Sequence, residues 1–294
     1  MADTAKHKLE DIKIHFKKLI FDSQSILSKE EYIFFQQSFK EFHWTPIFYG
    51  LPKVHKQPTT LRPVVSSSGS FLSIFSVWLD YKMKALLPLV QSNLKNSTAL
   101  IQDLKSLQIP PEALLFTADT TSMYTNIDIT TGVLAVRDFI TANLNSLPSN
   151  FPTDLFLQIL SIVMENNVFT LADMYWLQLV GTAMGTPVAC SYVMVSFGHY
   201  KNTTILPNFL PNLLYYKRYI DDVFGIWIPT QDNHSESWET FKTTLNNWGS
   251  LKWKVQELSK DTVFLDQRKV HSNLNISKNH EFVLVYPTIV CSPT

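Results

Sequence analysis

The feature that most constrains the fold is a pair of adjacent aspartates inside an apolar stretch. The segment YKRYIDDVFGIW, residues 216–227, indicates a buried strand or hairpin, because aromatic and β-branched residues dominate it. Asp221 and Asp222 are poor strand residues, and two carboxylates about 4 Å apart repel by roughly 4 kcal/mol at an effective dielectric constant near 20. One interpretation is a solvated hairpin turn, where aspartate is common. The other is a site for a cation.

A third aspartate in similar surroundings favours the cation. Asp119 ends the apolar run LLFTAD, which predicts a buried strand over residues 114–118. It lies 102 residues before Asp221, so only the fold can bring the two together. Carboxylates from the ends of adjacent strands make a site for hard divalent cations, which prefer oxygen ligands. Paired Mg²⁺ ions in such a site support phosphoryl transfer.

Composition sets wide bounds. The chain has 294 residues, 45% of them apolar and 17% charged, so it can bury a core, and its net charge is zero. Residues 42–110 hold seven basic and two acidic side chains, whereas residues 111–175 hold one basic and seven acidic. This charge asymmetry is compatible with a phosphate-binding lobe beside a metal-binding lobe. The alternative is a chance fluctuation in the distribution of charged residues. Cys190 and Cys291 match no metal spacing and predict reduced thiols in an intracellular protein. We expect neither a signal peptide nor a membrane span.

Periodicity and turn residues predict an α+β order of elements. Thr153 is the expected N-cap of one helix, and Thr186 the expected N-cap of another that begins at Pro187. The predicted helices cover residues 5–42, 71–88, 131–143, 154–165, 187 onward and 236–248. The predicted hairpins and strands cover residues 50–70 (as a surface loop or short hairpin), 114–118, 168–181 with a turn near Asp173, 214–228, 251–257 and 262–269.

Five sequence motifs, in the same order, resemble those of reverse transcriptases. They are LPK with LRPVVSS (51–67), which is similar to the fingers motifs; Asp119 followed five positions later by Tyr124, similar to motif A; GTAMGTP (181–187), similar to motif B; YIDD (219–222), similar to motif C; and residues 246–267, similar to motifs D and E. Five segments resemble the corresponding sequences of Penelope-like retroelements, namely YGLPKVHK, SMYTNI, GTAMGT, YKRYIDD and FLD. The resemblance covers about residues 49–267.

The resemblance implies a fold and a domain order. The expected fold is α+β, with the fingers and palm of a right-hand polymerase and a ferredoxin-like antiparallel palm sheet with helices on one face. We expect an N-terminal helical segment over residues 1–48, fingers and palm over 49–270, and a truncated tail over 271–294. The end of the chain, EFVLVYPTIVCSPT, is too short for a helical thumb. The expectation is therefore that a thumb and an endonuclease segment are missing from this chain.

The resemblance also assigns the carboxylates. Asp119, Asp221 and Asp222 would be catalytic and would hold two Mg²⁺ ions, for which Mn²⁺ could substitute. Asp119 and Asp221 would be the main ligands and Asp222 auxiliary, because neighbouring strand residues point to opposite faces. The main-chain carbonyl of Thr120 could complete a metal shell. The lysine that protonates pyrophosphate could be Lys252, Lys254 or Lys260.

Further residues are assigned to the substrates. Tyr124 would lie under the sugar of the incoming nucleotide and exclude a 2′-hydroxyl, and Arg62 would fork onto the triphosphate. The nucleotide-binding set is Lys53, Lys56, Arg62, Tyr124, Gly185 and Thr186, and the template–primer set is Gln178, Gly181, Phe264 and Leu265. The alternatives are an ordinary core aromatic for Tyr124, a solvated loop for the basic residues, a plain helix N-terminus for the glycines and a core-edge hydrogen bond for Gln178. The motif B loop is one residue longer than in retroviral enzymes, which leaves the role of Gln178 open.

The predicted function is that of an RNA-directed DNA polymerase domain of a retroelement. It would add deoxynucleotides to the 3′-hydroxyl of a primer on an RNA or DNA template. The alternative is a catalytically inactive, truncated remnant that at most binds nucleic acid. The lifestyle of the family suggests an intracellular and nuclear location, without a membrane partner.

Overall fold

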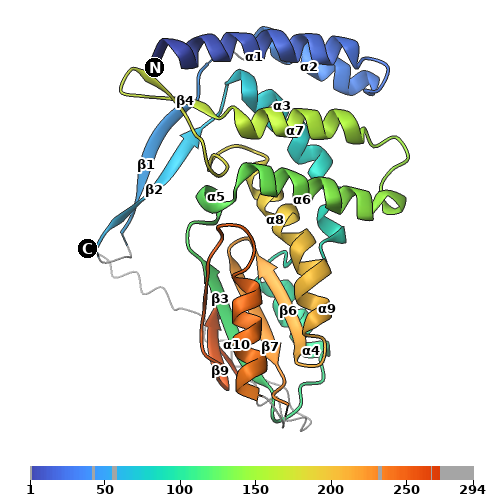
Figure 1. Cartoon of the computed structure of the whole chain (residues 1–294), viewed down its shortest axis with the longest axis vertical. Coiled ribbons are helices and arrows are strands. Elements are labelled where there is room, and N and C mark those ends of the chain that lie inside the picture. The colour runs from blue at the N-terminus through green and yellow to red at the C-terminus, as the bar shows by residue number, and fades with distance from the viewer. Residues whose placement is uncertain (1, 42–43, 55–57, 231–233, 266, 272–294) are drawn as a thin grey trace, which may run out of the picture. The chain divides into compact units, whose positions relative to one another are not determined.

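A computed structural model describes residues 2–41, 44–54, 58–230, 234–265 and 267–271. The chain forms two compact units (Figure 1). The first unit comprises Met1–Val90 and Ser122–His199, and the second comprises Gln91–Thr121 and Tyr200–Thr294. Lys56, a predicted nucleotide-binding residue, lies outside the described residues. No described helix is both long and apolar enough to cross a membrane.

The first unit begins with two helices, α1 (Ala2–Asp22) and α2 (Lys29–Glu41). The helical character predicted for residues 5–42 is therefore confirmed over these two helices, and the break between them at residues 23–28 was not predicted. A capping box starts the second helix: the Glu31 amide donates to Ser28 Oγ at 3.2 Å, and the Ser28 amide donates to Glu31 Oε2 at 3.0 Å. Serines around the break compete for backbone hydrogen bonds, which favours a new helix start over a continuous helix.

Four longer helices carry the core of the first unit, namely α3 (Phe71–Met83), α6 (Ile129–Ala142), α7 (Thr153–Glu165) and α8 (Ala189–Tyr200), the last of which ends at the boundary of the units. The predicted caps of α7 and α8 are wrong. Pro152 occupies the N-cap position of α7 without a side-chain bond, and Thr153 is the first helical residue. The Thr186 hydroxyl donates to the Ala183 carbonyl at 2.9 Å, and α8 begins three residues later. The helix α3 ends before Pro88, which lies in the short 3₁₀ turn η1 (Leu87–Leu89).

A four-stranded sheet of order β2-β1-β4-β5 completes the first unit. Strands β1 (Ile47–Lys53) and β2 (Thr60–Ser66) form a long antiparallel ribbon (Figure 1), so the predicted surface segment 50–70 is largely a hairpin. Strands β4 (Val168–Leu171) and β5 (Met174–Leu177) form the second hairpin. Its turn residues Ala172 and Asp173 have positive φ, which confirms the turn predicted near Asp173.

The second unit is built on an antiparallel sheet of order β6-β7-β3-β8. These strands are β6 (Leu213–Tyr219), β7 (Asp222–Trp227), β3 (Leu114–Thr120) and β8 (Trp253–Val255). The helix α10 (His234–Leu245) covers one face (Figure 1), where the Trp238 ring lies 5.1 Å from the rings of Phe116 and Trp227. This arrangement confirms the predicted α+β fold with an antiparallel palm sheet.

The opposite face of this sheet is covered by α4 (Ser97–Ser106), which the sequence analysis did not foresee, and by β9 (Asp261–Phe264). Leu100 and Leu104 of α4 join Phe224 in one buried cluster. Strand β9 pairs with β10 (Gln267–His271), so the strand predicted over residues 262–269 is a hairpin. The second segment of the unit begins with a π-helical turn, η3 (Lys201–Ile205), and α9 (Leu206–Asn208).

Candidate active site

The β6–β7 turn carries the two adjacent aspartates. Tyr219 pairs with Asp222, which leaves Ile220 and Asp221 as the two turn residues. Ile220 has φ = +52°, a left-handed conformation that is strained for a β-branched residue. Asp221 therefore lies in a tight turn, whereas Asp222 already belongs to strand β7. Strain of this kind at a turn is common at functional sites.

The fold brings Asp119 to the same place. Asp119 of β3 lies directly opposite Asp222 of β7, so their side chains share one face of the sheet. The Thr120 amide donates to the Asp221 carbonyl at 3.2 Å, which ties the turn to β3. The carboxylate that faces Asp119 across the strands is thus that of Asp222, the residue that the sequence analysis assigned an auxiliary role. Asp221 reaches the group from the turn.

The electrostatics of this group are unbalanced. Burial, followed by the negative charges of Asp221 and Asp119, raises the pKa of Asp222 to about 6. Such a shift means that negative charge at this end of the sheet has no sufficient counter-charge. Perturbed carboxylates of this kind gather at functional sites.

The donor set fits hard divalent cations. It consists of three carboxylates and the main chain of Thr120, all of them oxygen donors of the type that Mg²⁺ and Mn²⁺ prefer. Within the described residues, no three His, Cys, Asp or Glu side chains already stand close enough to hold an ion. The position of Asp119 opposite Asp222, with Asp221 adjacent, favours a cation here, and the raised pKa of Asp222 agrees with it, because a bound cation would offset the part of the shift that Asp221 and Asp119 cause.

One of the three candidate lysines lies beside these carboxylates. Lys254 of β8 is opposite Asp119 on the side away from Asp222. It is exposed, and within the described residues its ammonium group makes no hydrogen bond or ion pair. By contrast, Lys260 donates to the carbonyls of Pro111 and Ala113, and Lys252 donates to that of Asn246. Lys254 is therefore the lysine whose ammonium group remains available next to the aspartates.

In the first unit, several predicted site residues lie in or beside the loop 181–186. Tyr124 lies in the short helix α5 (Met123–Asn126), and its carbonyl accepts from the Thr182 amide at 2.7 Å. A Cβ atom on Gly181 would lie 2.5 Å from the same carbonyl, and φ is +76° there. The main chains of the loop and of α5 therefore touch at a point where a side chain does not fit.

The other end of this loop is fixed to β2. The Val65 amide donates to the Met184 carbonyl at 2.7 Å, and Ser67 Oγ donates to the Gly185 carbonyl at 3.3 Å. A Cβ atom on Gly185, where φ is +111°, would lie 2.5 Å from the Val65 carbonyl. Both glycines are thus required by close contacts of the protein main chain. Thr186 follows with its hydroxyl bonded to Ala183.

A pocket of about 240 Å³ lies beside the loop in the first unit. The side-chain amide of Gln178 donates to the Val180 carbonyl at 2.9 Å at its rim. The pocket is lined by Phe48, Pro63, Val65, Thr125, Phe169, Gln178, Val180, Thr182 and Met184. It therefore collects residues from both hairpins of the sheet, from the residue after Tyr124 and from the glycine loop.

Two of the predicted basic residues lie on the β1–β2 ribbon. Lys53 pairs with Thr60 and Leu51 pairs with Arg62, so both basic side chains emerge on the same face. In the described part of the chain, neither the Lys53 ammonium nor the Arg62 guanidinium has a hydrogen-bond or ion-pair partner. Both groups remain available to bind an anion.

The predicted primer contacts in the second unit have different surroundings. Phe264 is 3% exposed and its ring lies 5.6 Å from that of Phe224, so its side chain belongs to the hydrophobic cluster under the sheet. Leu265, at φ = +49°, packs partly against the same cluster. In this structure, Phe264 supports the β9–β10 hairpin and offers no surface to a primer.

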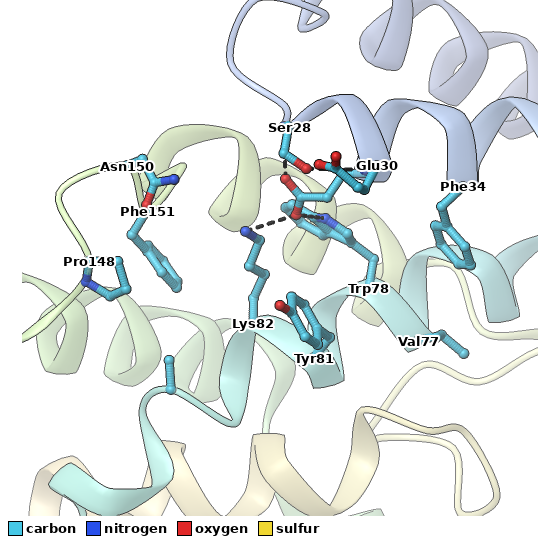
Figure 2. A pocket seen from close by; sticks show the side chains of 12 residues that line it. Ser28, Glu30, Phe34, Val77, Trp78, Tyr81, Lys82, Pro148, Asn150 and Phe151 are labelled. Carbon is cyan, nitrogen blue, oxygen red and sulfur yellow. Dashed lines mark hydrogen bonds and ion pairs between the residues drawn. The ribbon is translucent and has the colours of Figure 1, made fainter.

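Another pocket of the first unit, of about 750 Å³, is lined by no predicted site residue (Figure 2). Part of its polar wall is a network of hydrogen bonds around Glu31. Glu31 Oε1 accepts from Lys82 Nζ at 2.8 Å and from Trp78 Nε1 at 2.7 Å. The network joins α2 to α3, which explains its charges without a ligand.

Comparison with known proteins identifies the fold. No protein-family model and no curated protein matches the sequence. Among solved structures, C-terminally truncated apo telomerase from Candida tropicalis superposes with a TM-score of 0.54 at 11% identity, over 77% of this chain and 53% of that one. Telomerase from Candida albicans, in complex with a fragment of telomeric RNA, gives 0.55 at 12% identity over 77% and 45%.

A viral enzyme is similar to the same degree. The RNA-dependent RNA polymerase of BmCPV in its quiescent state gives a TM-score of 0.55 at 12% identity, over 91% of this chain and 26% of that one. The chain therefore spans about half or less of the length of these polymerases. The chain has the α+β fold of the fingers and palm of nucleic-acid polymerases, with Asp119, Asp221 and Asp222 at one end of its palm-like sheet.

Proposed function

We propose that this chain is an RNA-directed DNA polymerase domain of a retroelement. The observation that carries the proposal is the convergence of Asp119, Asp221 and Asp222 at one end of an antiparallel sheet in a polymerase-like fold. The fold supports nucleotidyl transfer in general. The choice of reverse transcription, and of a Penelope-like element, depends on the order of the five motifs and on Tyr124.

In this proposal the second unit holds two Mg²⁺ ions through Asp119, Asp221 and Asp222, with the Thr120 carbonyl as a further ligand, and Mn²⁺ can substitute. When bound, Mg²⁺ would activate the primer 3′-hydroxyl and stabilise the departing pyrophosphate. The 3′-oxygen forms a bond to the α-phosphorus as the bond from that phosphorus to the pyrophosphate oxygen breaks. Lys254 donates a proton to the pyrophosphate, because its ammonium group is the available one beside Asp119.

The first unit holds the nucleotide. Arg62 and Lys53 bind the triphosphate, since their charges on the β1–β2 ribbon have no partner within the described residues. Lys56 is assigned the same role from the sequence alone. The loop of Gly185 and Thr186 supports the nucleotide, while Gln178 and Gly181 lie near the template. Tyr124 excludes the 2′-hydroxyl of a ribonucleotide by its bulk.

The sugar preference gives a direct test of Tyr124. The variant Tyr124→Ala is expected to improve incorporation of ribonucleotides relative to deoxynucleotides by about tenfold or more, because the ring no longer occupies the space of the 2′-hydroxyl. Single-nucleotide extension with each sugar measures the ratio. The variant Tyr175→Ala, also half-buried but on β5, serves as a control. An unchanged ratio in Tyr124→Ala contradicts the steric role.

A nucleic-acid partner is supported by the neighbours, one of which is a telomerase in complex with a fragment of telomeric RNA. We infer that the partner of this chain is an RNA or DNA template–primer.

Primer extension on an RNA template with Mg²⁺ or Mn²⁺ tests the proposal. Wild type and Asp221→Ala are compared, with template–primer binding measured in the same preparations. Extension by the wild type alone supports a working reverse transcriptase. Absence of extension by both proteins, with binding intact, would favour the second candidate, an inactive remnant that binds nucleic acid.

A further inference from the structure

A buried arginine lies directly behind the aspartate turn. Arg218 of β6 is 0% exposed. It pairs with Val223, so its side chain emerges on the face of the sheet opposite to that of Asp222 and Asp119. Charged side chains are almost never fully buried unless they are paired.

The guanidinium group binds the turn itself. Arg218 Nη1 donates to the Ile220 carbonyl at 2.7 Å. Ile220 is the strained residue of the turn, and the next carbonyl, that of Asp221, accepts from the Thr120 amide at 3.2 Å. Both carbonyl groups of the two-residue turn are therefore held, one by Arg218 and one by β3. Fixing these two peptide groups fixes the directions in which Asp221 and Asp222 leave the main chain.

The main chain of Arg218 is itself anchored. Its amide donates to the Ser92 carbonyl at 2.7 Å, and its carbonyl accepts from the Leu94 amide at 2.9 Å. The segment 92–94 thus runs along the edge of β6. With its amide and its carbonyl both bonded to the segment 92–94 and its side chain buried, the arginine can act as a rigid support.

A buried arginine at position 218 is unfavourable for stability, because a second basic side chain, Lys201, is buried in the same unit. Lys201 of η3 is 0% exposed, and its ammonium nitrogen has no hydrogen-bond partner within the described residues. The charges of Arg218 and Lys217 act on it. An apolar side chain at position 218 would avoid the cost of removing a guanidinium charge from water, so stability alone does not explain the arginine.

We propose that Arg218 is a positioning residue for Asp221 and Asp222, which it orients through the Ile220 carbonyl. The inference rests on the proposed function, because orienting these carboxylates matters for binding divalent cations. Outer-shell groups that orient metal ligands commonly change metal affinity by about ten- to a hundredfold when removed.

The test compares Arg218→Met and Arg218→Lys with the wild type. The matched control is Tyr216→Phe, which alters a buried side chain on the same face of the same strand; the Tyr216 hydroxyl has no hydrogen-bond partner in the described part of the chain. The first readout is hydrogen exchange of a peptide spanning residues 217–223 in metal-free protein, with a β3 peptide as internal reference. The second is the affinity for Mn²⁺, measured by electron paramagnetic resonance.

For Arg218→Met we expect exchange at the turn to become about tenfold faster while the β3 reference is unchanged, since one charge-assisted hydrogen bond is lost. Affinity for Mn²⁺ should fall by about tenfold or more. Arg218→Lys, which can restore a single donor, should show smaller changes of the same sign, and it replaces Arg218→Met if that variant does not fold. Tyr216→Phe should behave as the wild type.

Unchanged exchange at the turn in a folded Arg218 variant overturns the proposal. Equal loss of protection at the turn and in β3 also overturns it, because that result marks Arg218 as a general structural residue. Failure of the wild type to bind Mn²⁺ or to extend a primer counts against the proposed function instead. In that case the exchange measurement still decides whether Arg218 orders the turn.

Discussion

Two carboxylates, Glu31 in the first unit and Asp222 in the second, have opposite surroundings. Burial acts to raise the pKa of Glu31, but hydrogen bonds from Lys82, Ser28 and Trp78 and the charge of Lys82 outweigh it, so the pKa lies below its usual range. Around Asp222, burial acts together with two further carboxylates, and the pKa rises to about 6.

The difference separates a structural use of charge from a functional one. Glu31 is held by a capping box, an ammonium group and an indole, so its negative charge is compensated inside the protein. Asp222 faces Asp119 and adjoins Asp221, so two further negative charges act on it where Glu31 has a positive one. If stability were the only requirement, we would expect the carboxylates around Asp222 to be paired with positive side chains, as Glu31 is paired with Lys82.

The largest effect is expected from a substitution in the aspartate group of the second unit. Asp221→Asn should lower nucleotide incorporation by about a thousandfold or more, because it removes a metal ligand. Its melting temperature should stay the same or rise, since one of the repelling charges is gone. Steady-state extension assays and calorimetry measure the two quantities.

The control for this substitution is Asp103→Asn. Asp103 is a carboxylate of the same unit whose Oδ2 accepts from the Tyr215 hydroxyl at 2.7 Å, outside the aspartate cluster. Activity should survive in this variant. A large drop in the melting temperature of Asp221→Asn would mark Asp221 as structural and erase the contrast with Glu31.

The substitution Glu31→Gln tests how much the buried Glu31–Lys82 ion pair contributes to stability. We expect the free energy of unfolding to fall by about 3 kcal/mol, because Lys82 is left mostly buried without its counter-charge. Glu30→Gln, an exposed neighbour at the same pocket, should change it little. Since the pKa of Glu31 is depressed in the folded state, its stabilisation is present above about pH 4.5 and is lost as the pH falls through the folded value. Equal denaturation curves for both variants would contradict this account.

Lys201 extends the comparison to a buried cation. Burial, and then the charges of Arg218 and Lys217, lower its pKa to about 6. The unfolded chain therefore binds this proton between about pH 6 and pH 10.5 while the folded chain does not, so stability rises with pH over that range by up to about 1.4 kcal/mol per unit. Lys201→Met should lack this rise. Denaturation with urea at several pH values measures it, and parallel pH profiles for the two proteins would refute it.

The smallest effect is expected at an exposed pair. Glu257 lies 3.1 Å from Lys242, but its side chain is 78% exposed, and Lys242 also contacts Glu239. Glu257→Gln should change the free energy of unfolding by about 0.5 kcal/mol or less, since solvent screens the pair. A loss as large as that expected for Glu31→Gln would mean that burial does not set the strength of these pairs.

Strand patterns and the aspartates were predictable from the sequence because they depend on local chemistry. The run 114–118, the hairpin around residues 219–222 and the turn near Asp173 follow from alternation and turn residues. The break between α1 and α2 was not foreseen, because apolar spacing continues across residues 23–28 and only the Ser28–Glu31 capping box ends the pattern.

Contacts between distant residues were beyond the sequence pattern. The pairing of Asp119 with Asp222 depends on the strand register, which the motif alone does not give. Phe264 has the same aromatic character whether it meets a primer or the core, and only the packing against Phe224 distinguishes the two. Arg218 lies two residues after Tyr216 and so shares its strand face, on which Val223 also lies. A basic residue at this position of an apolar strand face is a sequence signal that could have predicted a buried charge.

Only one register between β3 and β7 completes the carboxylate cluster. A slip of one residue would set Asp119 against Val223 or Asp221 and turn alternate side chains to the wrong face. The β6–β7 hairpin alone carries Asp221 and Asp222, and correct pairing with β3 adds Asp119. Binding of a divalent cation would report complete assembly of the second unit, and a cation present during refolding would select the correctly aligned sheet over every slipped one.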